Sequence, residues 1–182
     1  MKYIILAVSV IVLTGNSLYA QKYMTRTGKV TFFSATSLEN IEAFNNETGS
    51  VLDAKTGDII FQVPIRSFKF EKALMQEHFN ENYMESSKYP KAEYKGKITN
   101  LSAVNFAKDG RYDVQTAGKM TIHGVTKDVS IPGTITVKGN TITSASKFKV
   151  KTADYNIAIP KLVEGKIAKE IEVTVNSIMD KK

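Results

Sequence analysis

Few side chains in this sequence have the type and spacing that catalysis or metal binding requires. The chain contains no cysteine and only two histidines, His78 and His123, which excludes disulfides and thiolate chemistry and argues against a multi-histidine metal site. Asp154 and Tyr155 are candidate acid–base partners of His123, but no nucleophile or further acid lies at a spacing that supports them. We therefore predict no catalytic residue, no metal and no cofactor. His123 is expected to make a structural hydrogen bond at a strand end or tight turn.

The composition predicts one ordinary globular domain. The 182 residues are 42% hydrophobic and 24% charged, with a formal net charge of +7. These values argue against a disordered chain, a collagen-like repeat and a multi-span membrane protein. A chain of this length buries roughly 70% of its unfolded surface, so a single core suffices.

Residues 1–20 have the features of a secretory signal peptide. Lys2 precedes an apolar run over 3–13, which is followed by a polar break over 14–17 and by Ala20. We expect cleavage after Ala20, which leaves a domain over 21–182 in the periplasm or outside the cell. The alternative of a transmembrane anchor is disfavoured, because a span needs about 20 apolar residues and this run has about half of that.

Apolar residues in the rest of the chain recur mostly with a period of two, which is typical of β-strands. The pattern predicts strands around Val30 and Phe32 and over 41–53, 59–65, 91–98, 112–122, 129–137, 142–151 and 171–175. Turn residues at 55–58, 108–110 and 138–140 separate several of these runs, so consecutive strands are expected to be antiparallel neighbours. About eight strands with one apolar face each predict a mainly β fold, either a closed barrel or a two-sheet sandwich.

The segment over 70–85 departs from this period. Phe70, Leu74, Met75, Phe79 and Tyr83 recur at helical spacing among charged residues, which predicts an amphipathic helix. Because the helix lies between two strands, its apolar side is expected to pack against the sheet or across an open barrel end, either as a movable lid or as a permanent plug. A shorter helical piece is expected near 160–168, before the last strand.

Several short motifs follow one another along the chain. They are FQVPIRSF at 61–68, EHF at 77–79, SKYPKAEY at 87–94, MTIHGVTK at 120–127, TADYNI at 152–157 and EIEV at 170–173. Together they resemble the YceI-like, polyisoprenoid-binding protein family over nearly the whole of 21–182. The resemblance implies an eight-stranded antiparallel, lipocalin-like β-barrel that is exported to the periplasm. It also implies a long interior cavity that holds the isoprenoid chain of a quinone-like or polyprenyl lipid.

Inward-facing residues of the predicted strands are the candidate lining of such a cavity. Small residues at 116, 118, 133, 144 and 146 are expected to leave room for a ligand. A bound alkyl chain gains about 0.8 kcal/mol for each buried CH₂ group before entropy costs, so a long tail needs no charged contact. The alternative is a dry interior filled by side chains. The candidate lipid-contacting residues are Phe32, Phe61, Val63, Met75, Phe79, Tyr94, Ile98, Tyr112, Val114, Met120, Ile122, Phe148 and Val150.

Lysines form two stripes on the outward strand faces. One stripe is Lys147, Lys149 and Lys151, and the other is Lys91, Lys95 and Lys97. The stripes suggest transient contact with a membrane surface, but solvated strand faces explain them as well, since exterior lysines also prevent edge pairing. No nucleic-acid-binding module is visible.

We predict an exported binding protein, not an enzyme, that sequesters or carries an isoprenoid or similar long-chain hydrophobic lipid in the barrel interior. The expected partner is an isoprenoid quinone, a polyprenyl lipid or another long-chain lipid, and not nucleic acid; a monomer and an oligomer are both compatible with the sequence. One alternative is a lipid- or quinone-modifying enzyme that uses the same cavity with His123, Asp154 or Tyr155. Another is an accessory protein that carries no ligand and binds a partner through the barrel exterior.

Overall fold

The computed structural model describes residues 21–182, so the predicted signal peptide over 1–20 lies outside the described residues. The strands are β1 (Lys22–Ala35), β2 (Asn40–Asp53), β3 (Asp58–Pro64), β4 (Lys69–Phe70), β5 (Lys91–Ile98), β6 (Gly110–Ile122), β7 (Val125–Lys138), β8 (Thr141–Lys151) and β9 (Glu170–Lys181). The helical pieces are α1 (Ala73–His78), a π-helical turn (Phe79–Tyr83) and 3₁₀ turns at Ile65–Ser67, Leu101–Ala103, Thr152–Tyr155 and Lys161–Val163. Within 21–182, no helix has both the length and the apolar character needed to cross a bilayer.

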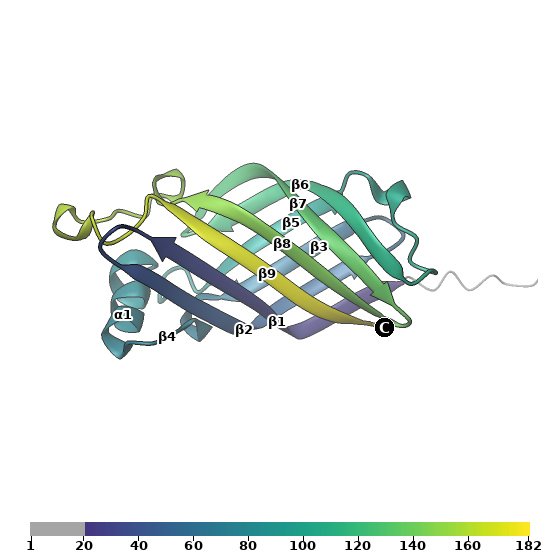
Figure 1. Ribbon diagram of the computed structural model, residues 1–182, viewed down its shortest axis with the longest axis horizontal. Helices are drawn as coiled ribbons and strands as arrows, with labels where there is room; N and C mark the ends of the chain where they lie inside the picture. Colours follow the sequence, from purple (N-terminus) through teal and green to yellow (C-terminus); the bar gives the residue numbers. More distant parts are fainter. Residues whose placement is uncertain (1–20) are drawn as a thin grey trace, which may run out of the picture.

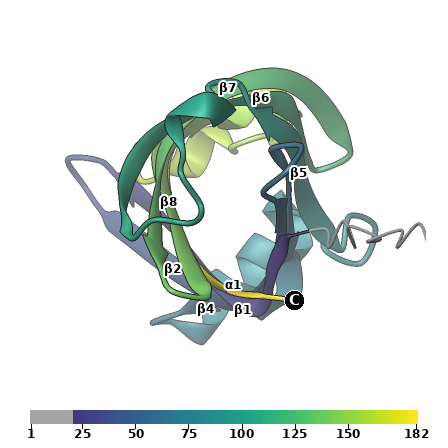
Figure 2. The ribbon, with the colours of Figure 1, turned by 90° about the vertical axis from the view of Figure 1, so that its right-hand side faces the viewer.

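Eight of these strands form a closed barrel. Strands pair antiparallel in the order β1-β2-β3-β5-β6-β7-β8-β9, and β9 pairs back onto β1, which closes the ring. Figure 1 shows the strands running side by side along the long axis, and Figure 2 shows the ring seen from one end. The two-residue β4 only flanks β2. The predicted eight-stranded antiparallel barrel is therefore confirmed, and the sandwich alternative is wrong.

The alternation of polar and apolar residues produces the two faces of the barrel wall. In β6, Val114 and Met120 are buried, whereas Gln115 and Lys119 between them are exposed. Successive side chains of a strand point to opposite faces of the sheet. The apolar set therefore enters the barrel and the charged set faces water.

Strand β1 is the irregular part of the wall. Its register against β2 shifts on both sides of Gly28, which marks a bulge. A Cβ added at Gly28 would come 2.7 Å from Ser177 Oγ and 2.9 Å from the carbonyl oxygen of Thr48. Nearby, the hydroxyls of Ser50 and Ser177 share a hydrogen bond of 2.6 Å between β2 and β9. Close backbone approach and small polar side chains thus narrow this side of the barrel.

The helix is shorter than the predicted span over 70–85. It begins only at Ala73, because Phe70 pairs with Ala43 of β2 as part of strand β4. The helical turn ends just before Glu85, whose φ of 42° is incompatible with a right-handed helix. Of the helical piece predicted near 160–168, only Lys161–Val163 is helical.

The two ends of the barrel carry different amounts of chain. We call one end the closed end; it carries the connections over 54–57, 99–109 and 139–140. We call the opposite end the mouth; it carries the connections over 36–39, 65–90, 123–124 and 152–169. Figure 1 shows α1 and the 152–169 segment together at the mouth, far from the C-terminus. Most of the chain outside the barrel wall therefore surrounds the mouth.

Candidate functional site

A cavity of about 380 Å³ extends from the mouth into the barrel. It reaches the surface among Glu39, His78 and Lys166, and its deep part is lined by Ile98 and Ile135. An apolar cavity of roughly 150 Å³ can hold benzene, and small-molecule sites commonly measure about 300–1,000 Å³. The hollow is therefore large enough for a hydrocarbon chain of several carbons.

All the predicted lipid-contacting residues except Tyr112 line this cavity. Tyr112 is partly buried near the closed end, where its hydroxyl donates a hydrogen bond of 2.9 Å to the carbonyl oxygen of Lys108. Its ring packs against the core there. Tyr112 thus lies on the inward face of β6, as the alternation predicts, but closer to the closed end than the cavity reaches. Two of the lining residues, Met75 and Phe79, come from the helical segment over the mouth.

Glycines in the wall leave less room for a ligand than the sequence suggested. Gly133 lines the cavity, but Gly118 does not. A Cβ added at Gly118 would collide with the backbone of Gly96 in β5, and one added at Gly96 would collide with the ring of Tyr94. These two glycines therefore allow close strand approach and make space for a side chain of the protein itself.

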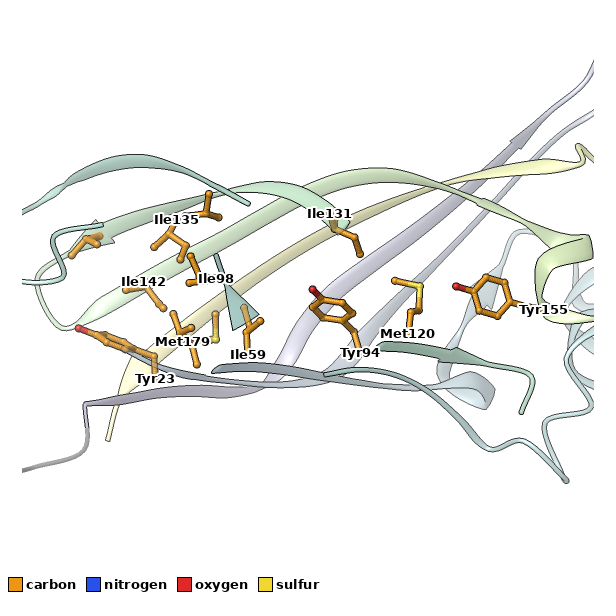
Figure 3. Packing of buried hydrophobic residues seen from close by; sticks show 13 residues of the cluster. Tyr23, Ile59, Tyr94, Ile98, Met120, Ile131, Ile135, Ile142, Tyr155 and Met179 are labelled. Carbon is orange, nitrogen blue, oxygen red and sulfur yellow. The ribbon is translucent and has the colours of Figure 1, made fainter. Parts of the chain in front are cut away.

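Large side chains fill the interior at the closed end. Tyr23, Ile142 and Met179 are at most 1% exposed and belong to one buried cluster. Figure 3 shows them gathered together, far along the barrel from Tyr155 near the mouth. Phe106 from the 99–109 connection stacks on Tyr23, with ring centroids 6.0 Å apart, and burial raises the pKa of the Tyr23 phenol. The interior is therefore a packed core at one end and a hollow toward the other.

The hydroxyls of Tyr94 and Thr116 line the middle of the cavity and are already hydrogen-bonded. Tyr94 donates a bond of 2.7 Å to Thr116 Oγ1, which in turn donates a bond of 3.1 Å to the carbonyl oxygen of Ile131. Burial raises the pKa of Tyr94, and the hydrogen bond with Thr116 partly offsets this effect. Because both hydroxyl protons are used within the wall, this part of the cavity offers a ligand mainly hydrocarbon contacts.

A cluster of phenylalanine rings forms one side of the mouth. The ring centroid of Phe79 lies 5.4 Å from Phe32, 5.4 Å from Phe68 and 5.0 Å from Phe70. All four rings line the cavity. Aromatic pairs at such distances contribute about 0.5–1.5 kcal/mol each beyond their buried area. These contacts attach the helical segment to β1 and β4 and make it part of the cavity wall.

His123 joins three segments at the mouth. With φ of 50°, it occupies the two-residue turn between β6 and β7. Its Nε2 lies 2.7 Å from Glu85 Oε2, and its Nδ1 lies 3.2 Å from the carbonyl oxygen of Tyr155. Tyr89 packs edge-on against the imidazole, with ring centroids 4.5 Å apart. The predicted structural hydrogen bond of His123 is thus confirmed, and neither His123, Asp154 nor Tyr155 is among the described residues that line the cavity.

Carboxylates compensate part of the charge of the two lysine stripes on the barrel exterior. In the stripe over 147–151, the lysine Nζ atoms lie 2.7–3.7 Å from carboxylate oxygens of two glutamates of β9. In the stripe over 91–97, Glu93 pairs with two lysines. The hydrogen bond from Lys95 is the main cause that holds the pKa of Glu93 below its ordinary value. Five of the six lysines thus share three glutamates, and no ion pair of Lys97 is found among the described residues, so the stripes keep part of their positive charge.

Several residues line the cavity that the sequence analysis did not select. Those on strands, such as Ile131 and Val173, share the inward faces that the period of two identifies, so alternation alone would have found them. Others, such as Phe68 and Val163, come from irregular segments at the mouth, where no period marks the inward side. Their place in the lining depends on how these segments fold over the barrel end.

The family model of the YceI-like domain matches residues 17–178. Among solved structures, the chain is similar to a polyisoprenoid binding domain from Saccharophagus degradans implicated in plant cell wall breakdown (TM-score 0.78, 13% identity, covering 90% of this chain and 99% of that one). It is also similar to BcnA of Burkholderia cenocepacia (TM-score 0.67, 21% identity, 84% and 95%) and to a YceI protein of Campylobacter jejuni (TM-score 0.56, 14% identity, 100% and 91%). No curated protein sequence matches the chain. At these identities the solved structures establish the shared fold.

Proposed function

We propose that this chain, which belongs to the YceI-like family, is a binding protein that holds a long-chain hydrophobic lipid inside its barrel. The observation that carries the proposal is the cavity of about 380 Å³, which opens at the mouth and is lined mostly by hydrocarbon side chains. The similar protein from Saccharophagus degradans is a polyisoprenoid binding domain. That likeness supports an isoprenoid ligand, such as the tail of a quinone or of a polyprenyl lipid.

The lining favours entry of the ligand with its tail first. The deep part of the cavity is bounded by Ile98, Ile131 and Ile135, whereas charged and titratable side chains, such as His78 and Lys166, border it at the surface. Beside these isoleucines, Ser144 is the one described lining residue with a buried side-chain oxygen that lacks a hydrogen-bond partner. Burying a polar head group there would therefore cost free energy, because one hydroxyl cannot replace the water that the head group loses. The head group is therefore expected to remain at the mouth.

The volume of the cavity sets the length of tail that it can enclose. On the scale at which a cavity of roughly 150 Å³ holds the six carbons of benzene, 380 Å³ accommodates roughly fifteen carbons, or about three isoprene units. Burial of that many carbons contributes about 12 kcal/mol before entropy costs. A longer tail must extend into the mouth or widen the cavity by displacing the segments that cover it.

Binding has more support than catalysis. The ring nitrogens of His123 contact Glu85 and the backbone carbonyl group of Tyr155, so both are already occupied by interactions that connect segments at the mouth. Asp154 is exposed, and its negative charge adds to the effect of burial in raising the pKa of Tyr155. A general base must reach the reacting group of its substrate, and none of these three residues borders the cavity.

We further propose that the protein works in the periplasm or outside the cell. The charged start, apolar run and small residue of the segment over 1–20 support export with cleavage after Ala20. The absence of cysteine from the sequence is compatible with an oxidising compartment, because no thiol needs protection there.

Retained lipid provides the direct test of the proposal. The protein is purified from its own host without detergent, weighed by native mass spectrometry, and extracted with organic solvent to identify any bound molecule. We expect a mass excess that disappears on extraction and an extract that contains a prenyl or other long-chain lipid. A ligand-free protein that also takes up no added quinone or fatty acid would contradict the proposal.

The same preparation separates the carrier from its alternatives. Turnover of an added quinone that is lost in His123→Ala while lipid retention is kept would favour the enzyme. A protein that carries no lipid but binds a partner protein through its outer wall would favour the accessory role.

A further inference from the structure

Exposed leucines gather around the mouth of the barrel. Leu38 is 71% exposed, Leu74 is 60% exposed and Leu162 is 95% exposed. They come from three different connections, namely the β1–β2 turn, helix α1 and the 3₁₀ turn before β9. Single exposed leucines are common on protein surfaces, whereas several around one opening mark an interaction site.

The three leucines belong to one continuous rim. Leu38 packs against the segment that carries Leu162, because its Cδ1 would be 3.0 Å from a Cβ added at Gly165. On its other side, Glu39 pairs with Lys72 at the start of α1, with 3.7 Å between Nζ and Oε1. Figure 1 shows the β1–β2 turn, α1 and the 152–169 segment at the same end of the molecule. We call Leu38, Leu74 and Leu162 the leucine rim.

The closed end has the opposite character. Its turns are Ala-Lys-Thr-Gly over 54–57 and Gly-Asn over 139–140, and the large apolar residues of the connection over 99–109, such as Phe106, pack against the buried cluster. Among the described residues, the other large apolar side chains with high exposure are Phe44, Ile60 and Ile178, which lie on the outer faces of three different strands. Exposed apolar residues in the connections are thus concentrated at the end where the cavity opens.

We propose that the leucine rim docks on the surface of a lipid bilayer, so that the cavity opens directly onto the membrane. This proposal rests on the proposed function, because a long-chain lipid that fits the cavity resides in a bilayer and must leave it without crossing water. Each of the three rim segments also contributes to the cavity lining, through Glu39, Met75 and Val163. Lipid that leaves a membrane at the rim would therefore enter the cavity between these same segments.

Beside Leu162, the charges of the rim are compatible with a phospholipid surface. The segment over 161–169 contains three lysines and one glutamate, and that glutamate pairs with Lys169 at 2.9 Å. Among residues 21–182, Lys161 and Lys166 have no carboxylate within ion-pair distance. Lysines beside an inserted apolar side chain extend toward phosphate groups.

A fluorescent label at the rim tests docking at single-residue resolution. The chain has no native cysteine, so Leu162→Cys accepts one environment-sensitive label, and Ile178→Cys on the outer face of β9 is the matched control. The full chain is mixed with vesicles of phosphatidylethanolamine and phosphatidylglycerol in a ratio of about 3:1, a mildly anionic surface. We expect the emission of the label at 162 to shift to the blue and to be quenched by spin-labelled lipids, with little change at 178.

A second variant measures the contribution of the rim to binding. The triple change Leu38→Ser, Leu74→Ser, Leu162→Ser removes three exposed side chains and should weaken vesicle binding by at least roughly tenfold. Ile178→Ser serves as the control of similar chemistry away from the rim. Because none of the three leucines lines the cavity, the triple variant should still bind a fluorescent fatty acid in the absence of vesicles.

The outcomes separate docking from ligand binding. An unchanged emission at position 162, or an equal change at 178, would overturn the docking proposal. The exposed leucines would then be better explained by contact with a partner protein. If the protein binds fatty acid in solution but the rim does not respond to vesicles, docking is wrong and the proposed function stands. If the rim inserts but no lipid is ever bound, docking stands and the proposed function fails.

Discussion

Replacing Ala92 with tryptophan should obstruct the cavity without removing any hydrogen bond. Ala92 lies on β5, is partly buried and lines the cavity close to the mouth. Its side chain makes no polar contact, so the substitution changes only the occupied volume. The new indole is expected to turn into the hollow, because that is the free space beside this position.

The magnitude follows from the volumes. A benzene-sized ring needs roughly 150 Å³, which is about two-fifths of the 380 Å³ cavity. Because benzene has six carbons, the ligand would lose room for roughly six of its own carbons. At about 0.8 kcal/mol for each buried carbon, the loss of binding free energy is about 5 kcal/mol as an upper limit. Partial relaxation of the wall reduces this loss, and we expect the affinity to fall by at least about tenfold.

Competitive displacement of a fluorescent polyene fatty acid measures this change. The matched control is Lys91→Trp on the same strand, because Lys91 is exposed and points to the outer face. The control should bind the probe as the unchanged protein does, and thermal unfolding followed by circular dichroism should show that both variants are folded. Equal affinities for Ala92→Trp and Lys91→Trp would refute the placement of the ligand in this cavity.

Three further predictions address the mouth and the buried tyrosines. Phe79→Ala should destabilise the fold by about 2 kcal/mol, which is less than the loss for a fully buried phenylalanine, and should speed ligand release. An unchanged urea midpoint and an unchanged release rate would show that the phenylalanine cluster does not attach the helical segment to the cavity wall. Gly124→Ala should lower the melting temperature and reduce the free energy of unfolding by about 1–3 kcal/mol, because φ is 75° there and the new Cβ would lie 2.5 Å from the Tyr89 ring. A melting temperature at or above that of the unchanged protein would contradict this prediction. Burial raises the pKa of Tyr94 and Tyr155 above the ordinary value of 10.0, so their stabilising contribution is present below pH 10.0 and is lost as the pH rises through the folded-state pKa. Phenolate absorbance should therefore show tyrosines that ionise only together with alkaline unfolding, and ionisation of all tyrosines near pH 10.0 in the folded protein would be the opposite result.

The regular strands could be predicted because their signal is local. In β6, the alternation of Val114 and Met120 with Gln115 and Lys119 marks the inward face without any knowledge of the neighbouring strands. The helix was less predictable at its start, since Phe70 fits a helical pattern but is recruited into β4 by its pairing with Ala43. An interaction with a residue far away in the sequence overrode the local preference there.

The lining of the mouth shows the same limit more strongly. Phe68 and Val163 border the cavity from segments without regular structure. The contact between Glu85 and His123 joins residues 38 positions apart, and no pattern in the sequence around either residue predicts the pair. Such contacts arise only when the barrel brings the connections of one end together.

The sequence by itself determined the antiparallel strands, their inward faces and the apolar character of the interior, because alternation and turn residues act over a few neighbouring positions. Alternation left a closed barrel and a two-sheet sandwich both open; the family resemblance favoured the barrel, and the pairing of β1 with β9 closes it. Only the tertiary structure decided where that interior is solid and where it is hollow. Tyr23 and Met179 meet at the closed end, and Ser50 bonds Ser177 across 127 positions. The distance that inward side chains must bridge depends on strand register and curvature, which are set by contacts between residues that are far apart in the chain.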